Sequence, residues 1–446
     1  MRQSGVNLRA EAGSQNRRLT RAIRARTPLR AGAAAGGPAA AAAAAGPAAA
    51  SMALAAPLTR GMGEAARGQV AGWIGFCGLW VYSMVVLGGV TRLTRSGLSM
   101  TDWKFTGERP PLDAADWEAE FAKYRQSPEF KKVNLGMSLE EFKFIYFMEW
   151  AHRMWGRALG FAFLLPFGFF AARGAATGAT YLNPALRRRL LLIFAAGGGQ
   201  GLVGWWMVKS GLEEPADRHA VPRVSPYRLA AHLTSAFAIY GALVWTYLSV
   251  AMPQSALMAS FEAGRLDAAR HALRLRAAAA PVAALVAVTA VSGAFVAGLD
   301  AGHAYNTFPL MGDPGRLVPE AYWDLYPELG VRNFFENTAA VQFDHRALAT
   351  ATVAAVGGLW AAFRRAPLPP RSKTLLHLML GMVGVQFSLG VSTLLLHVPV
   401  SLGSAHQAGA LMLMTLGGAL LHSLRVAPGV RRQLLAGAAR AAKGGA

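Results

Sequence analysis

The segment Phe147-Met148-Glu149-Trp150-Ala151-His152-Arg153 places a carboxylate, an imidazole and a guanidinium within five residues of one another. It stands inside an apolar run that extends from residue 144 to residue 171. Ionisable side chains are costly to bury at membrane depth, so within a membrane helix they indicate a functional site. Glu149 and His152 are three residues apart, which puts them on one face of a helix. The segment therefore predicts a membrane helix that carries a site.

The composition is that of a protein with many membrane spans. Of the 446 residues, 53% are hydrophobic and 15% are charged, against about 25% charged residues in soluble domains. The net charge of +21 raises the question of nucleic-acid binding. However, the basic residues gather in an N-terminal tail and in short segments between apolar runs, as the positive-inside rule requires. No nucleic-acid partner is therefore expected.

The chain has a single cysteine, Cys77. One cysteine excludes a cysteine-built metal site or a disulfide framework within one chain.

The first 60 residues differ in composition from the rest of the chain. They hold nine arginines, one acidic residue and an alanine-rich tract from about Ala31 to Ala56. An arginine-rich, acid-poor segment of this kind is typical of an organellar transit peptide, which takes no part in the fold. A disordered low-complexity tail is the alternative. Residues 1–60 are therefore left out of the predicted fold.

Eight apolar runs are long enough to cross a bilayer, which takes about 20 helical residues. They lie near residues 70–91, 144–171, 189–209, 229–251, 277–299, 338–363, 374–397 and 400–424. We therefore predict an all-α polytopic membrane protein with eight transmembrane helices.

The charges between these runs predict the orientation. Spans two and three are joined by a segment with arginines and no acid, as are spans six and seven, and the tail 425–446 is basic as well. The segment 300–336 holds six acids instead. Because basic loops stay on the inner side of a membrane, both termini are predicted there, on the matrix side if the protein is mitochondrial. The long loop 92–143 then folds over the outer face.

The two halves of the chain resemble each other in sequence. Four matches occur in the same order: Leu87-Gly88-Gly89-Val90 with Ser292-Gly293-Ala294-Phe295, Glu149-x-x-His152-Arg153 with Gln342-x-x-His345-Arg346, Gln200-Gly201-Leu202-Val203-Gly204 with Gln386-Phe387-Ser388-Leu389-Gly390, and His232 with His406. Each half holds an even number of spans, so the repeats are parallel. We predict two tandem, pseudo-symmetric four-helix bundles, at residues 70–251 and 277–424.

Four of the ten histidines take part in this repeat. His152, His232, His345 and His406 all lie in even-numbered spans, roughly 6–13 Å from the outer ends at about 1.5 Å per residue. Each bundle thus presents two imidazoles from two helices at similar depth. This arrangement favours bis-histidine ligation of a haem iron in each bundle over structural hydrogen bonding. Nearby glycines would either make room for a flat ring or pack helices closely, and both interpretations stay open.

Two other metal sites are excluded by the sequence. Glu-x-x-His also occurs in di-iron carboxylate bundles, but here the second copy begins with Gln342, and spans three, four, seven and eight hold no carboxylate. A zinc protease would need the motif His-Glu-x-x-His, which the sequence does not contain.

Three arginines, Arg153, Arg157 and Arg346, stand close to the histidines in the sequence. They would either neutralise haem propionates directed toward the outer face, or snorkel and pair with a neighbour such as Asp344. Both interpretations stay open.

The halves differ where Glu149 is replaced by Gln342. A partly buried glutamate can act as an acid or a base, and glutamine cannot. The difference predicts chemistry in the first half and a fixed electron-transfer haem in the second. A structural pairing of Glu149 with Arg153 is the alternative.

At this point the sequence resembles the haem A synthase family, in particular its mitochondrial and proteobacterial branch. The resemblance covers about residues 70–425 and rests on four stretches: GGVTRLTRSGLSMTDW at 88–103, EWAHRMWGR at 149–157, GLDAGHAYNTFPLMG at 298–312 and QFDHR at 342–346. Many bacterial members carry a cysteine pair in an outer loop, whereas Cys77 here is alone and lies in a span. A mechanism that relies on those thiols is therefore excluded for this chain.

The resemblance implies oxidation of the C8 methyl of haem O to a formyl group, which yields haem A for cytochrome c oxidase. It implies substrate haem at His152 and His232, a haem b cofactor at His345 and His406, and a catalytic role for Glu149. The expected partners are haem O, an electron donor such as a ferredoxin, haem O synthase and cytochrome c oxidase assembly factors, in the mitochondrial inner membrane. Oxygen insertion, electron abstraction with attack by water, and a homo-oligomer all stay open.

Two functions from other classes remain as alternatives. One is a di-haem b electron-transfer protein of the cytochrome b561 or quinone-reductase type, and the other is a non-enzymatic haem carrier for oxidase assembly. The exchange of Glu149 for Gln342 argues against the first, because pure electron transfer needs no such difference between the halves.

Overall fold

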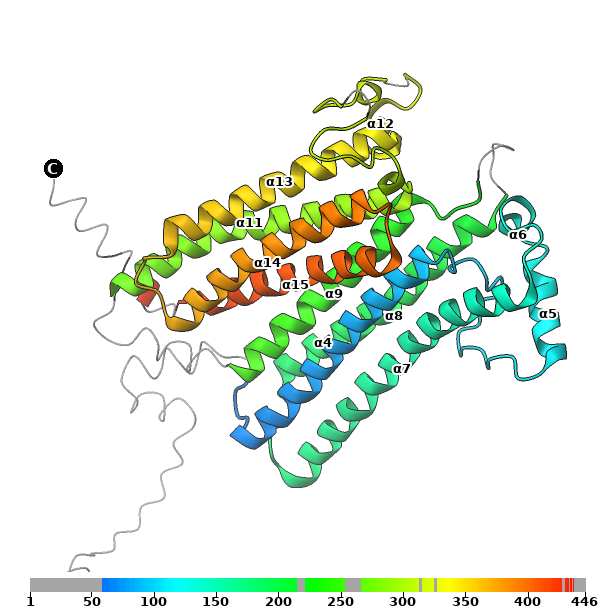
Figure 1. Ribbon diagram of the computed structural model, residues 1–446. Helices are drawn as coiled ribbons and strands as arrows, with labels where there is room; N and C mark the ends of the chain where they lie inside the picture. Colours follow the sequence, from blue (N-terminus) through cyan, green and yellow to red (C-terminus); the bar gives the residue numbers. More distant parts are fainter. Residues whose placement is uncertain are drawn as a thin grey trace, which may run out of the picture. The chain divides into compact units, whose positions relative to one another are not determined.

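The computed structural model describes residues 58–214, 221–252, 266–312, 315–324, 327–426, 430–432, 434 and 436 (Figure 1). Within these residues the regular secondary structure is helical, apart from one isolated bridge between Met311 and Arg316. The prediction of an all-α protein is confirmed. The predicted transit peptide falls on residues 1–60, of which 1–57 lie outside the described residues.

Eight of the described helices are longer than 20 residues and carry the apolar runs. They are α4 (Glu64–Leu93), α7 (Leu139–Thr177), α8 (Pro184–Leu212), α9 (Pro226–Ala251), α11 (Leu266–Gly298), α13 (Thr338–Phe363), α14 (Pro370–Leu395) and α15 (Val400–Ser423). The first seven are long and apolar enough to cross a membrane. Polar residues, among them His406 and Gln407, interrupt the apolar sequence of α15. The polytopic membrane protein is confirmed, and the count of eight spans stays a prediction.

Local sequence signals start several of these helices. Ser138 and Glu141 form a capping box at the start of α7, in which each side chain accepts a hydrogen bond from the other residue's backbone. Proline occupies the first turn of α8, α9 and α14, where no backbone donor is needed. Gly178 ends α7 in the left-handed conformation that glycine adopts without steric cost.

The long helices pack in two groups that follow the sequence repeat. In the first half α4 packs against α7 and α9, and α8 packs against α7 and α9. In the second half α13 packs against α11 and α14, and α15 packs against α11 and α14. The halves also meet directly, because α15 contacts both α4 and α9, and α9 contacts α11. The described helices belong to one compact unit, so the two predicted bundles share an interface.

The long segments that join α4 to α7 and α11 to α13 lie at one end of the long helices. We call this end the loop end. It carries α5 (Ala114–Tyr124), α6 (Pro128–Lys132) and α12 (Asn333–Glu336), which Figure 1 shows beyond the ends of α7 and α13. Buried aromatic residues fix α5 and α6 on the start of α7, including Phe121 stacked on Phe142. An ion pair of 2.8 Å between Arg92 and Asp300 joins the two halves here. The loop 92–143 therefore folds into an ordered cover rather than a simple connection.

Candidate functional site

Each of the four repeated histidines lies against a glycine of a neighbouring helix. A Cβ atom added to the glycine would stand 2.8–3.1 Å from an imidazole atom in every case. The pairs are Gly88 of α4 with His152 of α7, Gly204 of α8 with His232 of α9, Gly293 of α11 with His345 of α13, and Gly390 of α14 with His406 of α15. These four glycines therefore make room for the imidazoles themselves. The sequence marked them as repeat positions, but their partners only become visible in three dimensions.

The two histidines of the second half face each other. The ring centroids of His345 and His406 are 6.4 Å apart, and the rings are perpendicular at 88°. Two imidazoles on opposite sides of one metal ion, with metal–nitrogen bonds of about 2 Å, place their centroids roughly 6 Å apart. The separation of the two rings would therefore let both histidines hold one metal ion.

Hydrogen bonds fix the orientation of both rings in the second half. Ser292 Oγ lies 2.7 Å from His345 Nδ1. Gln386 Nε2 lies 3.1 Å from His406 Nδ1 and donates to the backbone carbonyl of His406 at 2.9 Å. These contacts engage the Nδ1 atoms and not the Nε2 atoms of the two rings. Ser292 Oγ donates to the carbonyl of Thr289 at 2.8 Å and can accept from the Nδ1–H of His345, which is the direction of hydrogen bonding that orients metal-ligating histidines in general.

The first half repeats this arrangement around His232. Gln200 Nε2 lies 3.1 Å from His232 Nδ1 and donates to its carbonyl at 2.8 Å, while Ser235 donates to the Gln200 side chain at 2.6 Å. The counterpart of Ser292 is Leu87, which cannot hydrogen-bond. Within the described residues the ring of His152 forms no hydrogen bond, so of the four rings it is the one without a polar restraint.

Glu149 is a buried anchor at the loop end of α7. Its side chain is 3% exposed. One carboxylate oxygen accepts hydrogen bonds from Ser99 Oγ at 2.7 Å and from the backbone N–H of Met100 at 2.8 Å. The other accepts from Arg153 at 2.7 Å. The structural pairing with Arg153 that the sequence left open is thus present, and it ties the segment after α4 to α7.

Gln342 holds the equivalent position in the second half, but it donates hydrogen bonds to its loop where Glu149 accepts them. Its amide nitrogen donates to the carbonyl of Ala301 at 2.6 Å and to the carbonyl of Ala304. Its amide oxygen accepts from Arg346 at 3.0 Å. The loop after α11 presents acceptors to this position, whereas the loop after α4 presents donors to Glu149. The difference between the two side chains therefore matches the loops that they hold.

The three arginines near the histidines are bonded to loop carbonyls. Arg153 donates to Asp102 at 2.8 Å and to Met100 at 3.1 Å. Arg157 donates to the carbonyls of Phe105 and Lys104. Arg346 does the same in the second half, to the carbonyls of Thr307 at 2.9 Å and Tyr305 at 2.7 Å. Of the two interpretations, pairing with neighbours is present, although the neighbours are loop carbonyls together with Glu149 for Arg153 and Gln342 for Arg346, and not Asp344. Propionate binding stays a prediction.

Other metal centres find no support in the part of the chain that the structure describes. No group of three or more histidine, cysteine, aspartate or glutamate side chains there could hold a metal ion. The free thiol of Cys77 is buried between apolar neighbours. The fold brings His345 and His406 together in the second half, and in the first half His232 lies close enough to His152 to act on it electrostatically.

Comparison with known proteins supports the resemblance. The COX15-CtaA family model, described as cytochrome oxidase assembly protein, matches residues 71–417. A heme A synthase COX15 of Arabidopsis thaliana is 57% identical over 363 residues, which are 81% of this chain and 76% of that protein. The human heme A synthase COX15 is 46% identical over 82% of this chain and 85% of its own length. The heme A synthase of Nitrosospira multiformis is 45% identical over 81% of this chain and 95% of its own length.

The four histidines, the glycines against which they pack, Glu149 and Gln342 lie inside the matched range. The match covers more than half of the chain, and the relatives come from plants, animals and bacteria. The chain is therefore a member of the COX15-CtaA family, the family of the heme A synthases.

Proposed function

We propose that this protein is a haem A synthase, an oxidoreductase that converts the C8 methyl of haem O to a formyl group. The observation that carries the proposal is the pair of repeated sites, each with two histidines on different helices and a glutamine that orients one of them. The family relatives that bear the name heme A synthase support it.

The two sites take different roles in this proposal. His152 and His232 hold the substrate haem, and His345 and His406 hold a haem b cofactor. The polar restraint on the His345 ring supports a permanent group in the second half, because a fixed ligand geometry suits a group that never leaves. The unrestrained ring of His152 supports a group that enters and leaves. When bound, haem b would supply one-electron transfer.

The loop end of the first half shields the substrate site from water in this proposal. Glu149 and Arg153 hold residues 99–102 against α7, next to His152 in the chain. Glu149 is also the proposed proton acceptor during oxidation of the methyl group. Among the described residues, its Oε1 accepts only the hydrogen bond from Arg153, so it keeps a lone pair for this second role.

The cellular setting follows the family. The relatives and the apolar helices support a mitochondrial membrane protein. We further propose the inner membrane, with both termini in the matrix and residues 1–60 as the transit peptide. The proposed partners are haem O, an electron donor such as a ferredoxin, haem O synthase and cytochrome c oxidase assembly factors.

Pigment extraction tests the proposal against its alternatives. The full chain is expressed in cells that make haem O and purified in detergent, and its haems are separated by chromatography. We expect haem b together with haem O or haem A. Haem b alone at both sites would support a di-haem electron-transfer protein instead. Haem O that is retained but never oxidised, with a reductant supplied, would support a non-enzymatic carrier.

A further inference from the structure

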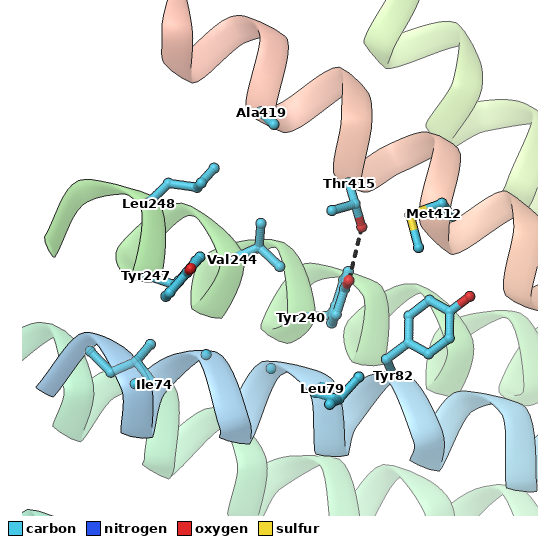
Figure 2. A pocket seen from close by; sticks show the side chains of 13 residues that line it. Ile74, Leu79, Tyr82, Tyr240, Val244, Tyr247, Leu248, Met412, Thr415 and Ala419 are labelled. Carbon is cyan, nitrogen blue, oxygen red and sulfur yellow. Dashed lines mark hydrogen bonds between the residues drawn. The ribbon is translucent and has the colours of Figure 1, made fainter. Parts of the chain in front are cut away.

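A cavity of about 540 Å³ lies between the two halves, away from all four histidines. It is bounded by α4, α9 and α15 (Figure 2). This volume falls within the range of about 300–1,000 Å³ that is usual for small-molecule sites. Its walls are mainly apolar, and Gly72 and Gly78 of α4 leave space along one side, while Gly75 packs against the ring of Tyr247.

Hydrogen bonds between helices close the cavity toward the loop end. Tyr82 donates to the carbonyl of Ala408 at 3.0 Å, and Tyr240 bonds to Thr415 at 2.8 Å. Figure 2 shows Tyr82 and Tyr240 at one end of the space, with Leu248 and Ala419 toward the other. The cavity therefore extends away from the loop end, toward the opposite ends of these helices.

A polar group follows directly beyond Ala419 on α15. His422 lies one helical turn further along, where its Nε2 is 3.2 Å from Ser249 Oγ of α9 and 2.6 Å from an Arg425 nitrogen. Arg425 also lies over the ring of Trp245, at 5.6 Å from its centroid. The buried His422 and the cation of Arg425 thus follow the last cavity-lining residue of α15, Ala419, along the chain.

Four arginines gather at this end of the helices, and we call them the arginine cluster. They are Arg189 of α8, Arg276 of α11, Arg371 of α14 and Arg425 after α15. Arg276 and Arg189 act electrostatically on Arg425, and Arg371 and Arg276 act on His422. All four stand at the ends of predicted spans, where the head groups of a bilayer are expected.

No acidic residue balances this charge in the described part of the chain. Within it, none of the four arginines forms an ion pair, and the nearby Asp267 pairs with Arg270 at 3.1 Å. Burial, followed by the charges of Arg276 and Arg189, lowers the pKa of Arg425 to about 10, so its guanidinium keeps its charge at neutral pH. The sequences that flank the cluster, 364–373 and 424–446, contain no acid. Glu262 belongs to the segment 253–265, outside the described residues.

We propose that an anionic phospholipid binds at this place, with its phosphate on the arginine cluster and an acyl chain in the cavity between the two halves. Basic pockets between transmembrane helices bind anionic head groups such as that of cardiolipin. A free phosphate would use the cations but leave the apolar cavity without a function, and a neutral lipid would leave the cations unbalanced. A lipid seated here would bridge α4 and α9 of the first half to α15 of the second.

The charge half of the proposal is tested with the full chain, purified and stripped of lipid in detergent. Cardiolipin, phosphatidylcholine and inorganic phosphate are added separately, and bound lipid is measured by native mass spectrometry together with the melting temperature. We expect retention of cardiolipin and a raised melting temperature, with little effect of the other two. Arg276→Gln combined with Arg371→Gln should weaken cardiolipin binding by about 30-fold.

A matched control changes the same charge nearby. Arg364→Gln with Arg365→Gln removes two cations from the same end of α13, outside the cluster. Cardiolipin binding should then stay within about twofold of the unchanged protein. Equal weakening by both pairs of substitutions, or equal binding of cardiolipin and phosphatidylcholine, would overturn the proposal. Stabilisation by inorganic phosphate alone would show a free-phosphate site instead.

The cavity half is tested by filling the space without changing any charge. A Cβ atom at Gly72 or Gly78 would meet nothing within 4 Å, so Gly72→Leu and Gly78→Leu can occupy the cavity without displacing the backbone. Both should reduce cardiolipin retention at least tenfold, while Gly381→Leu, equally unhindered and exposed on α14, should not. Circular dichroism verifies that each variant is folded. Unchanged retention in both cavity variants would refute the acyl-chain site.

Discussion

The first half of the protein, from α4 to α9, and the second, from α11 to α15, build the same site with different restraints. In both halves two histidines stand against glycines, and a glutamine on the third helix holds the histidine of the fourth. The second half adds Ser292, which holds the other histidine, whereas the first half has Leu87 in that place. A repeated architecture can therefore give one site in which hydrogen bonds hold both histidines and another in which hydrogen bonds hold one of the two.

The second difference concerns the residue three positions before the first histidine of each half. Glu149 faces two hydrogen-bond donors from its loop, and Gln342 faces two acceptors from the corresponding loop. Each side chain also accepts from the arginine four residues later. A carboxylate at position 342 would bring its charge against two carbonyl oxygens. The exchange of Glu for Gln thus has a structural cause, whether or not it also has a chemical one.

The largest effect should come from removing one ligand in each half. We expect His345→Ala to abolish haem b binding almost completely while the helices stay folded, because one axial ligand cannot replace two. His152→Ala should instead lose the substrate haem and keep haem b. Chromatography of extracted haems measures both results. Unchanged haem content in His345→Ala would disprove the assignment of the second site.

The second prediction separates the two roles of Glu149. In Glu149→Gln the amide N–H₂ must face either Arg153 or the donors of Ser99 and Met100, so one hydrogen bond is lost and a donor is left unpaired. Leaving buried partners unpaired costs about 1–3 kcal/mol. We expect both haems to remain bound and formyl production to fall at least 100-fold, as measured by the ratio of haem A to haem O.

Limited proteolysis of residues 94–113 tells these roles apart. If Glu149 acts as proton acceptor alone, the loop of Glu149→Gln stays protected and only turnover is lost. If it acts by positioning the loop, the segment becomes sensitive to protease as activity falls. The control Gln342→Glu should destabilise the second half without removing the first site. A normal rate of haem A production in Glu149→Gln would contradict any role in the reaction.

The third prediction exchanges the restraint on the histidine rings. Ser292→Leu removes the hydrogen bond to His345 and should weaken haem b binding by about 10–100-fold, as for other residues that orient metal ligands. Leu87→Ser should give His152 the restraint that it lacks, retain substrate haem longer and slow its exchange. Haem transfer to apomyoglobin measures both rates. If Ser292→Leu left haem release unchanged, the hydrogen bond from Ser292 that distinguishes the two halves would have no role in haem binding.

The smallest effect concerns the ordered cover of the first half. Glu129 of α6 is buried and accepts a hydrogen bond from Tyr124, and burial raises its pKa from 4.5 to about 7. The folded state therefore binds this proton more tightly than the unfolded state. Its contribution to stability is complete below about pH 4.5 and is lost as the pH rises through about 7, by up to about 3 kcal/mol.

Melting temperatures between pH 5 and 8 measure this dependence. Glu129→Gln should flatten the decline toward high pH, because the amide keeps its hydrogen bond at every pH. Glu141 of the capping box is a control whose pH dependence runs in the opposite direction. Hydrogen bonds from Ser138 lower its pKa, so its contribution to stability is lost as the pH falls. An unchanged pH profile in Glu129→Gln would show that the burial of this carboxyl does not limit stability.

Much of the fold could be predicted because long apolar runs in the sequence mark membrane helices. All eight predicted runs fall on helices, but several helices begin before the predicted start, α11 at Leu266 instead of 277 and α7 at Leu139 instead of 144. At α7 the capping box of Ser138 adds a turn beyond the apolar run. The loop 92–143 was expected to cover one face, and the packing of its aromatic residues specifies how. The number of spans, the domain boundaries and the orientation remain predictions.

The sequence alone determined the helices, the repeat and the four histidines, because hydropathy and residue spacing depend on order along the chain. Only the tertiary structure decided what surrounds Glu149 and His152, since those contacts come from residues about 50–65 positions away. It also explained the exchange of Glu149 for Gln342. Hydrogen-bond polarity depends on which backbone groups a loop presents, and that depends on the path of the loop in space.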